Sequence, residues 1–227
     1  MKKYLILILF TSFIYNSSNA QVKVGLLGGM NISDAKQDQF FFTYSKIKTK
    51  LMFGAVADIP VANNFSIRLE PLYIEKGTES GQIKIEEFPA KASFELSYFE
   101  VPILLTFTTG NTLKPFVFVG PTIGFNTASD VSLDAGIFEL AVDAENISDE
   151  IEYSINIGGG INFQVDDFIS IFLETRYVFG LNDVIKKGEF ELSLGNLSGT
   201  GKIPPTTKYM NKGLQFMAGF SFPITID

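Results

Sequence analysis

Residues 151–165 decide the fold, and they read IEYSINIGGGINFQV. Their odd positions are apolar apart from Gly159, and their even positions carry glycine or a polar residue: Glu152, Ser154, Asn156, Asn162 and Gln164. Alternation of this kind indicates a β-strand, because successive side chains of a strand point to opposite faces. The stretch therefore predicts a strand with one apolar and one polar face.

The same alternation recurs along the chain, in residues 21–31, 49–59, 65–75, 96–108, 115–126, 169–179 and 213–225. Within the central part of these eight segments, the apolar face carries no charged residue. The opposite face carries nine: Lys23, Lys50, Asp58, Arg68, Glu70, Glu100, Glu152, Glu174 and Arg176. One face of every predicted strand therefore lies where a charge is not tolerated.

The connections between these segments alternate in length. Short turns fall at residues 60–64, 109–114 and 166–167, and long connections fall at 32–48, 76–95, 127–150 and 180–212. An even number of antiparallel strands with short turns at one end and long loops at the other is typical of bacterial outer-membrane barrels. We therefore predict an all-β fold, an eight-stranded antiparallel up-and-down transmembrane β-barrel.

The first twenty residues have the pattern of a cleaved signal peptide. Lys2 and Lys3 precede an apolar run over residues 4–15, and Ser18-Asn19-Ala20 places small residues at a cleavage site. The alternative is a membrane anchor, but a spanning helix needs about 20 apolar residues. We expect a signal peptide over residues 1–20 and one barrel domain over residues 21–227.

Composition narrows the functional classes. The chain has no Cys and no His, and its formal net charge is −7. Histidine is the commonest general base and metal ligand, and nucleic-acid binding needs clustered Lys and Arg. We therefore expect no enzyme activity, no catalytic residues, no cofactor, no metal site and no nucleic-acid partner.

The direction in which the apolar faces point separates two kinds of barrel. A soluble ligand-binding barrel of the lipocalin type points them inward, whereas a membrane barrel points them at lipid. The polar faces here hold few charges and many small residues, which suits a crowded lumen better than a wet surface. We therefore expect contact with outer-membrane lipid. The aromatic belts would come from Tyr73, Phe99, Phe107, Phe125, Tyr153, Phe163, Tyr177 and Phe179.

Charges turned into the lumen need partners there, because burying an unpaired charge is costly. The candidates near the strand centres are Arg68, Glu70, Glu100, Glu174 and Arg176. One interpretation is a path for protons or ions. The favoured one is a network of ion pairs that fills the lumen, since eight strands enclose a space that side chains can fill.

Five segments in order carry a family resemblance: GLLGGMNI at residues 25–32, LEPLY at 69–73 followed by Lys76-Gly77, YFEVP at 98–102, KPFVFVGP at 114–121 and ETRY at 174–177. Together they resemble the PorT-like "porin family" outer-membrane β-barrel proteins of Bacteroidota. The resemblance implies an outer-membrane barrel without catalytic residues, and one branch of the family takes part in protein secretion and gliding. Such chains often end on an aromatic residue; the last residues here are FPITID, and Phe222 is the candidate for that role.

The favoured function is a monomeric structural or interaction barrel of the outer membrane, with long loops outside and an accessory role in protein secretion. The loop at 127–150 holds seven acidic residues, either a surface for a protein partner or cation or an ordinary solvated loop: Asp130, Asp134, Glu139, Asp143, Glu145, Asp149 and Glu150. The alternatives are a narrow pore or transporter for small solutes and, less favoured, an outer-membrane lipid-modifying enzyme.

Overall fold

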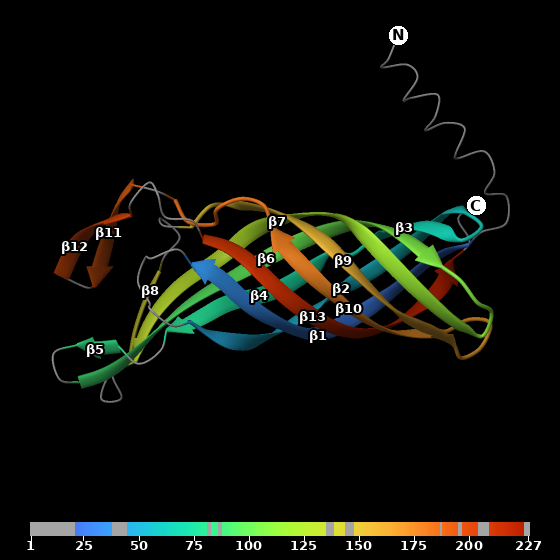
Figure 1. The fold of residues 1–227 in the computed structure, drawn as a ribbon, viewed down its shortest axis with the longest axis horizontal. Coiled ribbons are helices and arrows are strands. Elements are labelled where there is room, and N and C mark those ends of the chain that lie inside the picture. Colours follow the sequence, from blue (N-terminus) through green and yellow to red (C-terminus); the bar gives the residue numbers. More distant parts are fainter. Residues whose placement is uncertain are drawn as a thin grey trace, which may run out of the picture.

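The predicted segments form a closed ring of strands in the computed structural model (Figure 1). Each of the eight positions in this ring is here called a stave, and one stave can consist of two successive strands. The structure describes residues 21–37, 45–80, 83–85, 88–134, 139–143, 148–186, 188–194, 197–203 and 209–224. The predicted signal peptide at residues 1–20 lies outside them. Eight staves form the ring: β1 (Val22–Gln37), β2 (Ser45–Ala62), β3 (Phe65–Leu69) with β4 (Leu72–Ser80), β6 (Phe88–Thr108), β7 (Leu113–Asp134), β9 (Ile151–Gln164), β10 (Ser170–Gly180) and β13 (Tyr209–Ile224).

Each stave pairs antiparallel with the next along the chain, and the first pairs with the last. The β1–β13 register runs from Val22 opposite Ile224 to Gln37 opposite Tyr209, which closes the ring. The other staves follow in chain order, through β2, β3 with β4, β6, β7, β9 and β10. The predicted eight-stranded antiparallel barrel is confirmed. Within the described part of the chain, no helix is long and apolar enough to cross a membrane.

The third stave is broken, where the sequence predicted one strand over residues 65–75. β3 ends at Leu69 and β4 begins at Leu72, so Glu70 and Pro71 lie between them. Proline has no N–H to donate to a strand ladder, which explains the interruption. The wall stays hydrogen-bonded across it, since Ala55 N donates to Pro71 O (3.0 Å) and Glu70 N donates to Pro102 O (3.2 Å).

The strands also extend further than predicted into the four long connections. The β6–β7 ladder continues from Phe99 opposite Phe125 to Lys91 opposite Asp134. Short strands occupy other parts of those connections: β5 (Ile83–Ile85), β8 (Glu139–Asp143), β11 (Gly188–Leu194) and β12 (Leu197–Ile203). Backbone pairing needs no alternation of side chains, and the prediction depended on alternation. The extension was therefore missed.

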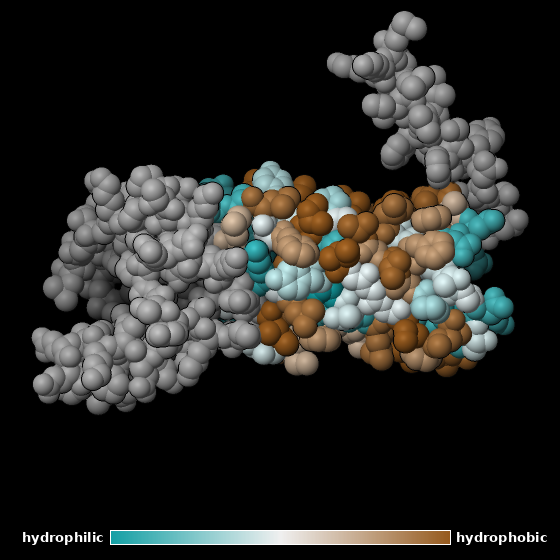
Figure 2. Space-filling model, in the orientation of Figure 1, coloured by the Kyte–Doolittle hydropathy of each residue, from teal (hydrophilic) through white to brown (hydrophobic). Residues whose placement is uncertain are grey.

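The outer face of the ring is apolar and the inner face is mixed. In β10, exposed and buried residues alternate without exception; Leu173 is 54% exposed, whereas Glu174 is 5% exposed. Ile171 and Phe220 also lie on the outer surface, which excludes the inward-facing apolar lining of a soluble ligand-binding barrel. Figure 2 shows hydrophobic side chains over the described part of the barrel surface.

All eight predicted belt aromatics lie on this outer wall, and several form a row across it. Phe53, Tyr73, Phe99 and Phe125 are successive register partners on β2, β4, β6 and β7. The rings of Phe53 and Tyr73 lie 5.4 Å apart, a distance typical of a favourable aromatic pair. The row gives the wall a continuous aromatic strip where lipid would contact it.

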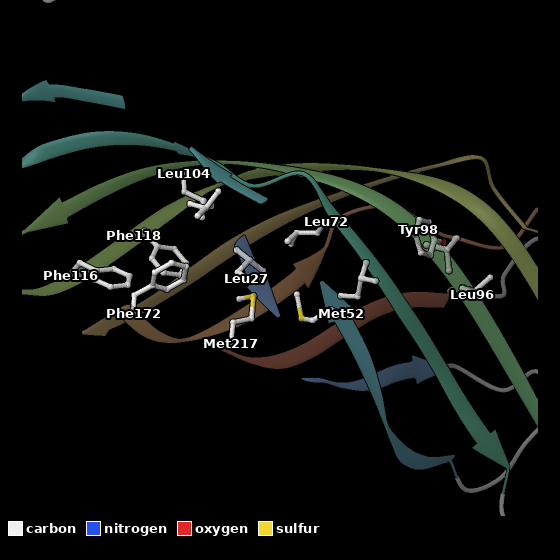
Figure 3. Close-up of a cluster of buried hydrophobic side chains, with 13 residues drawn as sticks. Leu27, Met52, Leu72, Leu96, Tyr98, Leu104, Phe116, Phe118, Phe172 and Met217 are labelled. Atoms are coloured by element: carbon white, nitrogen blue, oxygen red, sulfur yellow. The ribbon is translucent and has the colours of Figure 1, made fainter. Parts of the chain in front are cut away.

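Inside the barrel, buried apolar side chains form a cluster (Figure 3). Phe116 and Phe118 of β7 lie over Gly160 and Gly158 of β9. A Cβ at Gly158 would come within 2.7 Å of Phe118 Cζ, and one at Gly160 within 2.6 Å of Phe116 Cζ. Glycine is therefore needed at both positions, because the rings occupy the space that a side chain would take.

Candidate functional site in the barrel lumen

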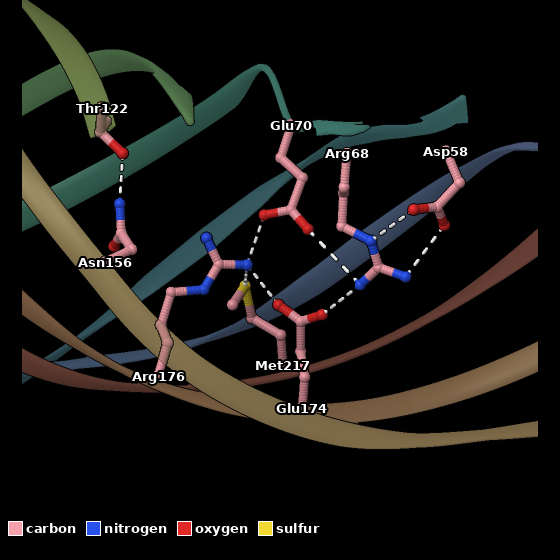
Figure 4. Close-up of polar contacts among 8 residues, drawn as sticks. All are labelled: Asp58, Arg68, Glu70, Thr122, Asn156, Glu174, Arg176 and Met217. Carbon is pink, nitrogen blue, oxygen red and sulfur yellow. Dashed lines mark hydrogen bonds and ion pairs between the residues drawn. The ribbon is translucent and has the colours of Figure 1, made fainter. Parts of the chain in front are cut away.

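The lumen holds a cluster of five ionisable residues, here called the arginine cluster: Asp58, Arg68, Glu70, Glu174 and Arg176 (Figure 4). Four of them are buried and Asp58 is half-buried. Arg68 binds Asp58 with two parallel hydrogen bonds, Nε to Oδ1 at 2.8 Å and Nη2 to Oδ2 at 2.9 Å. Its Nη1 donates to Glu174 Oε2 at 2.7 Å. Arg68 thereby joins two carboxylates through all three of its nitrogens.

Arg176 completes the cluster from the other side. Its Nη2 alone contacts Glu70 Oε2 and Glu174 Oε1, and it also lies 3.6 Å from the sulfur of Met217. Arg176 and Glu70 are 1% and 0% exposed. Aromatic rings support both guanidinium groups: Arg68 lies 4.7 Å from the ring centre of Phe116, and Arg176 lies 5.2 Å from that of Phe118.

A second group, the lysine cluster, consists of Lys76, Glu100, Glu152 and Asn211. Lys76 Nζ contacts Glu100 Oε1 at 2.6 Å and Glu152 Oε2 at 2.9 Å. Asn211 Nδ2 donates to the same oxygen of Glu152, also at 2.9 Å. The ammonium lies 4.9 Å from the ring centre of Tyr98. These contacts join β4, β6, β9 and β13.

The sequence-predicted lumen residues are thus divided between the two clusters. Arg68, Glu70, Glu174 and Arg176 lie together, whereas Glu100 pairs with Lys76. Sequence reasoning missed Lys76 and Asn211, since it placed both in long loops. The sequence does hold a signal for Lys76, because it follows Leu72 and Ile74 at a spacing of two and therefore shares their face of the strand. In the structure all three residues are buried.

The predicted acidic loop at 127–150 is only partly a loop. β7 and β8 form a ladder there, with Asp130 opposite Asp143 and Asp134 opposite Glu139. Glu145 lies outside the described residues. In the part of the chain that the structure describes, no group of three or more Asp and Glu residues is arranged to hold a metal ion.

The two ends of the lumen differ. A vestibule of about 530 Å³ opens at the short-turn end, and its lining includes Arg68 and Phe116. A void of about 10 Å³ lies beside the lysine cluster, with Lys76 and Asn211 in its lining. The ion pairs of the two clusters can hold the strands of the ring together, and their side chains fill part of the lumen.

A closed ring with an apolar outer wall and a charge-filled interior defines a small transmembrane β-barrel of the outer-membrane type. The chain belongs to the outer membrane protein beta-barrel domain family, whose sequence model matches residues 15–186. That membership places it in the outer membrane. A search of curated proteins gave no match.

Solved structures of outer-membrane proteins are similar to this chain. OprG from Pseudomonas aeruginosa has a TM-score of 0.53 and 12% identity, covering 91% of this chain and 97% of that one. Ail, the attachment invasion locus protein of Yersinia pestis, has a TM-score of 0.43 and 12% identity, covering 90% and 100%. The outer membrane protease OmpT from Escherichia coli has a TM-score of 0.40 and 10% identity, covering 91% and 98%. At 12% identity the likeness to OprG shows the fold alone.

Proposed function

We propose that this protein is a closed structural and interaction barrel of the outer membrane, accessory to protein secretion, that acts through its long-loop end. The observation that carries this is the path of the arginine cluster across the lumen. Arg68 on β3 contacts Glu174 on β10, and Arg176 on β10 contacts Glu70 at the end of β3. These staves lie four places apart in a ring of eight and therefore face each other.

Ion pairs between opposite staves act as cross-braces. Each connects two parts of the wall that no backbone hydrogen bond joins, so the lumen cannot widen without separating buried charges. Separating such a pair leaves an uncompensated charge, which costs several kcal/mol. The lysine cluster adds a second brace closer to the long-loop end, between β4, β6 and β9.

The test of closure is conductance of the purified protein in a planar lipid bilayer. We expect no stepwise current from the wild-type chain. A double variant, R176M/E174L, would remove part of the brace while leaving fewer unpaired charges, and we expect it to show intermittent current. Steady stepwise current from the wild type would overturn the closed barrel in favour of a narrow pore.

The accessory role in secretion rests on the resemblance to the PorT-like proteins, and the partner surface is the extension of β6, β7 and β8 beyond the apolar wall. The register there pairs Asp130 with Asp143 and Asp134 with Glu139, so this part of the ladder is acidic and suits a partner with basic groups. Cross-linking and pull-down from native outer membrane should recover a secretion component. The variant D130N/D134N/E139Q/D143N should lose it, whereas K186Q should retain it.

A further inference from the structure

We propose that the vestibule at the short-turn end is a binding site for a small hydroxylated anion of the sugar-phosphate class. This inference is independent of the proposed interaction role, because it concerns the opposite end of the barrel. Its starting point is charge. The whole chain carries a formal net charge of −7, yet the side chains that line the vestibule include Lys23, Lys114 and Arg68 against one carboxylate, Asp58.

Neither lysine of this set forms an ion pair within the described structure, although Asp58 is the register partner of Lys23. Arg68 is bound to Asp58 through two parallel hydrogen bonds, which satisfies that carboxylate. Lys114 Nζ donates to Gln164 Oε1, a neutral acceptor, at 2.9 Å. Among the described residues, no carboxylate lies within ion-pair distance of Lys23 or Lys114. β1 and β7 are four places apart in the ring, so these lysines approach the vestibule from opposite walls.

A second observation points to a ligand with hydrogen-bonding groups. Asn162 lines the vestibule, is 8% exposed, and its Oδ1 has no hydrogen-bond partner within the described structure. A buried amide oxygen without a partner is costly, so the site suits a ligand that carries a hydroxyl donor. Asn63, Asn111 and Thr109 add further amides and a hydroxyl around the same space.

The size and shape fit the same class. The volume of about 530 Å³ is within the range of small-molecule sites, and the vestibule ends at the buried arginine cluster. An anion held between two lysines would gain charge-assisted hydrogen bonds, which are about twice as strong as neutral ones. Its hydroxyls would then face the amides of Asn162 and the turn residues.

The test is isothermal titration calorimetry on the full barrel in phosphatidylcholine nanodiscs, with glucose 6-phosphate, inorganic phosphate and glucose as probes. We expect glucose 6-phosphate to bind more tightly than phosphate, and glucose more weakly than either. K23Q and K114Q should each weaken glucose 6-phosphate binding about tenfold. K23R/K114R should restore binding, and K186Q, which removes a lysine charge outside the vestibule, should leave it unchanged.

N162A separates the two parts of the recognition. It should lower affinity for glucose 6-phosphate toward that for inorganic phosphate and leave phosphate binding unchanged. Titration in phosphatidylglycerol nanodiscs identifies the source of the anion: loss of glucose 6-phosphate binding there would assign the site to a lipid headgroup, and retained binding would assign it to a soluble ligand. If no probe binds the wild-type barrel, or if K23Q/K114Q binds glucose 6-phosphate as the wild type does, the proposal is overturned.

Discussion

The arginine cluster and the lysine cluster both pair carboxylates inside the lumen with cations, but they use different cationic groups. Both hold one more carboxylate than cation: three against two around Arg68 and Arg176, and two against one around Lys76. The first uses planar guanidinium groups that bridge opposite staves. The second uses a single ammonium, with an amide from Asn211 on one carboxylate. A guanidinium can fix several partners in defined directions, whereas an ammonium is a point charge whose surroundings must supply the rest.

The largest effect should come from removing a cation of the arginine cluster. R176M leaves Glu70 and Glu174 buried with only Arg68 to share, and we expect it to lower the free energy of unfolding by about 5 kcal/mol. Guanidinium unfolding of the detergent-solubilised barrel measures this. Adding E70Q should recover part of the loss, since it removes one of the stranded charges. A cost below that of any lysine-cluster variant would reverse the ranking of the two clusters.

Removing the lysine of the second cluster should cost less. K76M leaves Glu100 and Glu152 without their cation, but Asn211 still donates to Glu152. We expect a loss of about 3 kcal/mol in the same unfolding measurement. K76M/E100Q should be more stable than K76M alone. If the double variant were no more stable, repulsion between the two carboxylates would not be the cause of the loss.

Exchange of arginine for lysine sharpens the comparison within one cluster. Arg68 uses Nε, Nη1 and Nη2, whereas Arg176 contacts both carboxylates through Nη2 alone. A lysine, which has a single nitrogen, can therefore reproduce more of the contacts of Arg176 than of those of Arg68. We expect R68K to cost about 2 kcal/mol and R176K about half as much. Equal costs would show that the fork geometry of Arg68 adds nothing beyond its charge.

The smallest effect should come from the amide in the lysine cluster. N211A removes one hydrogen bond to Glu152, whose charge Lys76 still balances. We expect a loss of about 1 kcal/mol, read as a small downward shift of the thermal unfolding midpoint. N63A, at the exposed end of the vestibule, is the control and should leave the midpoint in place. A larger effect than that of K76M would contradict the view that the ammonium dominates this cluster.

The two clusters also differ in how well the sequence predicts them. Arg68, Glu70, Glu174 and Arg176 lie on segments with clear alternation, so the sequence alone predicts that all four point into the lumen. Lys76 follows the Pro71 interruption and lies one residue beyond the predicted segment. Asn211 lies on a part of β13 that extends past the lipid-facing wall, where polar residues occur on both faces. Alternation of apolar and polar residues predicts which way a side chain points only in the strand segments that face lipid. Beyond those segments the outer face meets water instead, and the alternation is lost.

The alternation of apolar and polar residues does not predict which lumen charges form ion pairs with each other, even within the lipid-facing segments. Alternation gives the direction of Glu100 but not its vertical level, and register places it opposite Leu72 and near Lys76. Level in a barrel depends on the stagger of every preceding strand. The sequence therefore yields which charges are inside, and only the assembled ring shows which of them meet.

Closure of the ring has a consequence for the speed of folding. The strands that seal it, β1 and β13, begin near the two ends of the chain and pair over sixteen positions from Val22–Ile224 to Gln37–Tyr209. Contacts between residues so distant in sequence give a high contact order, and chains with high contact order fold slowly. The β1–β13 pairing cannot form until nearly the whole polypeptide has been synthesised. The chain must therefore be kept unfolded and unaggregated until β13 is available to pair with β1.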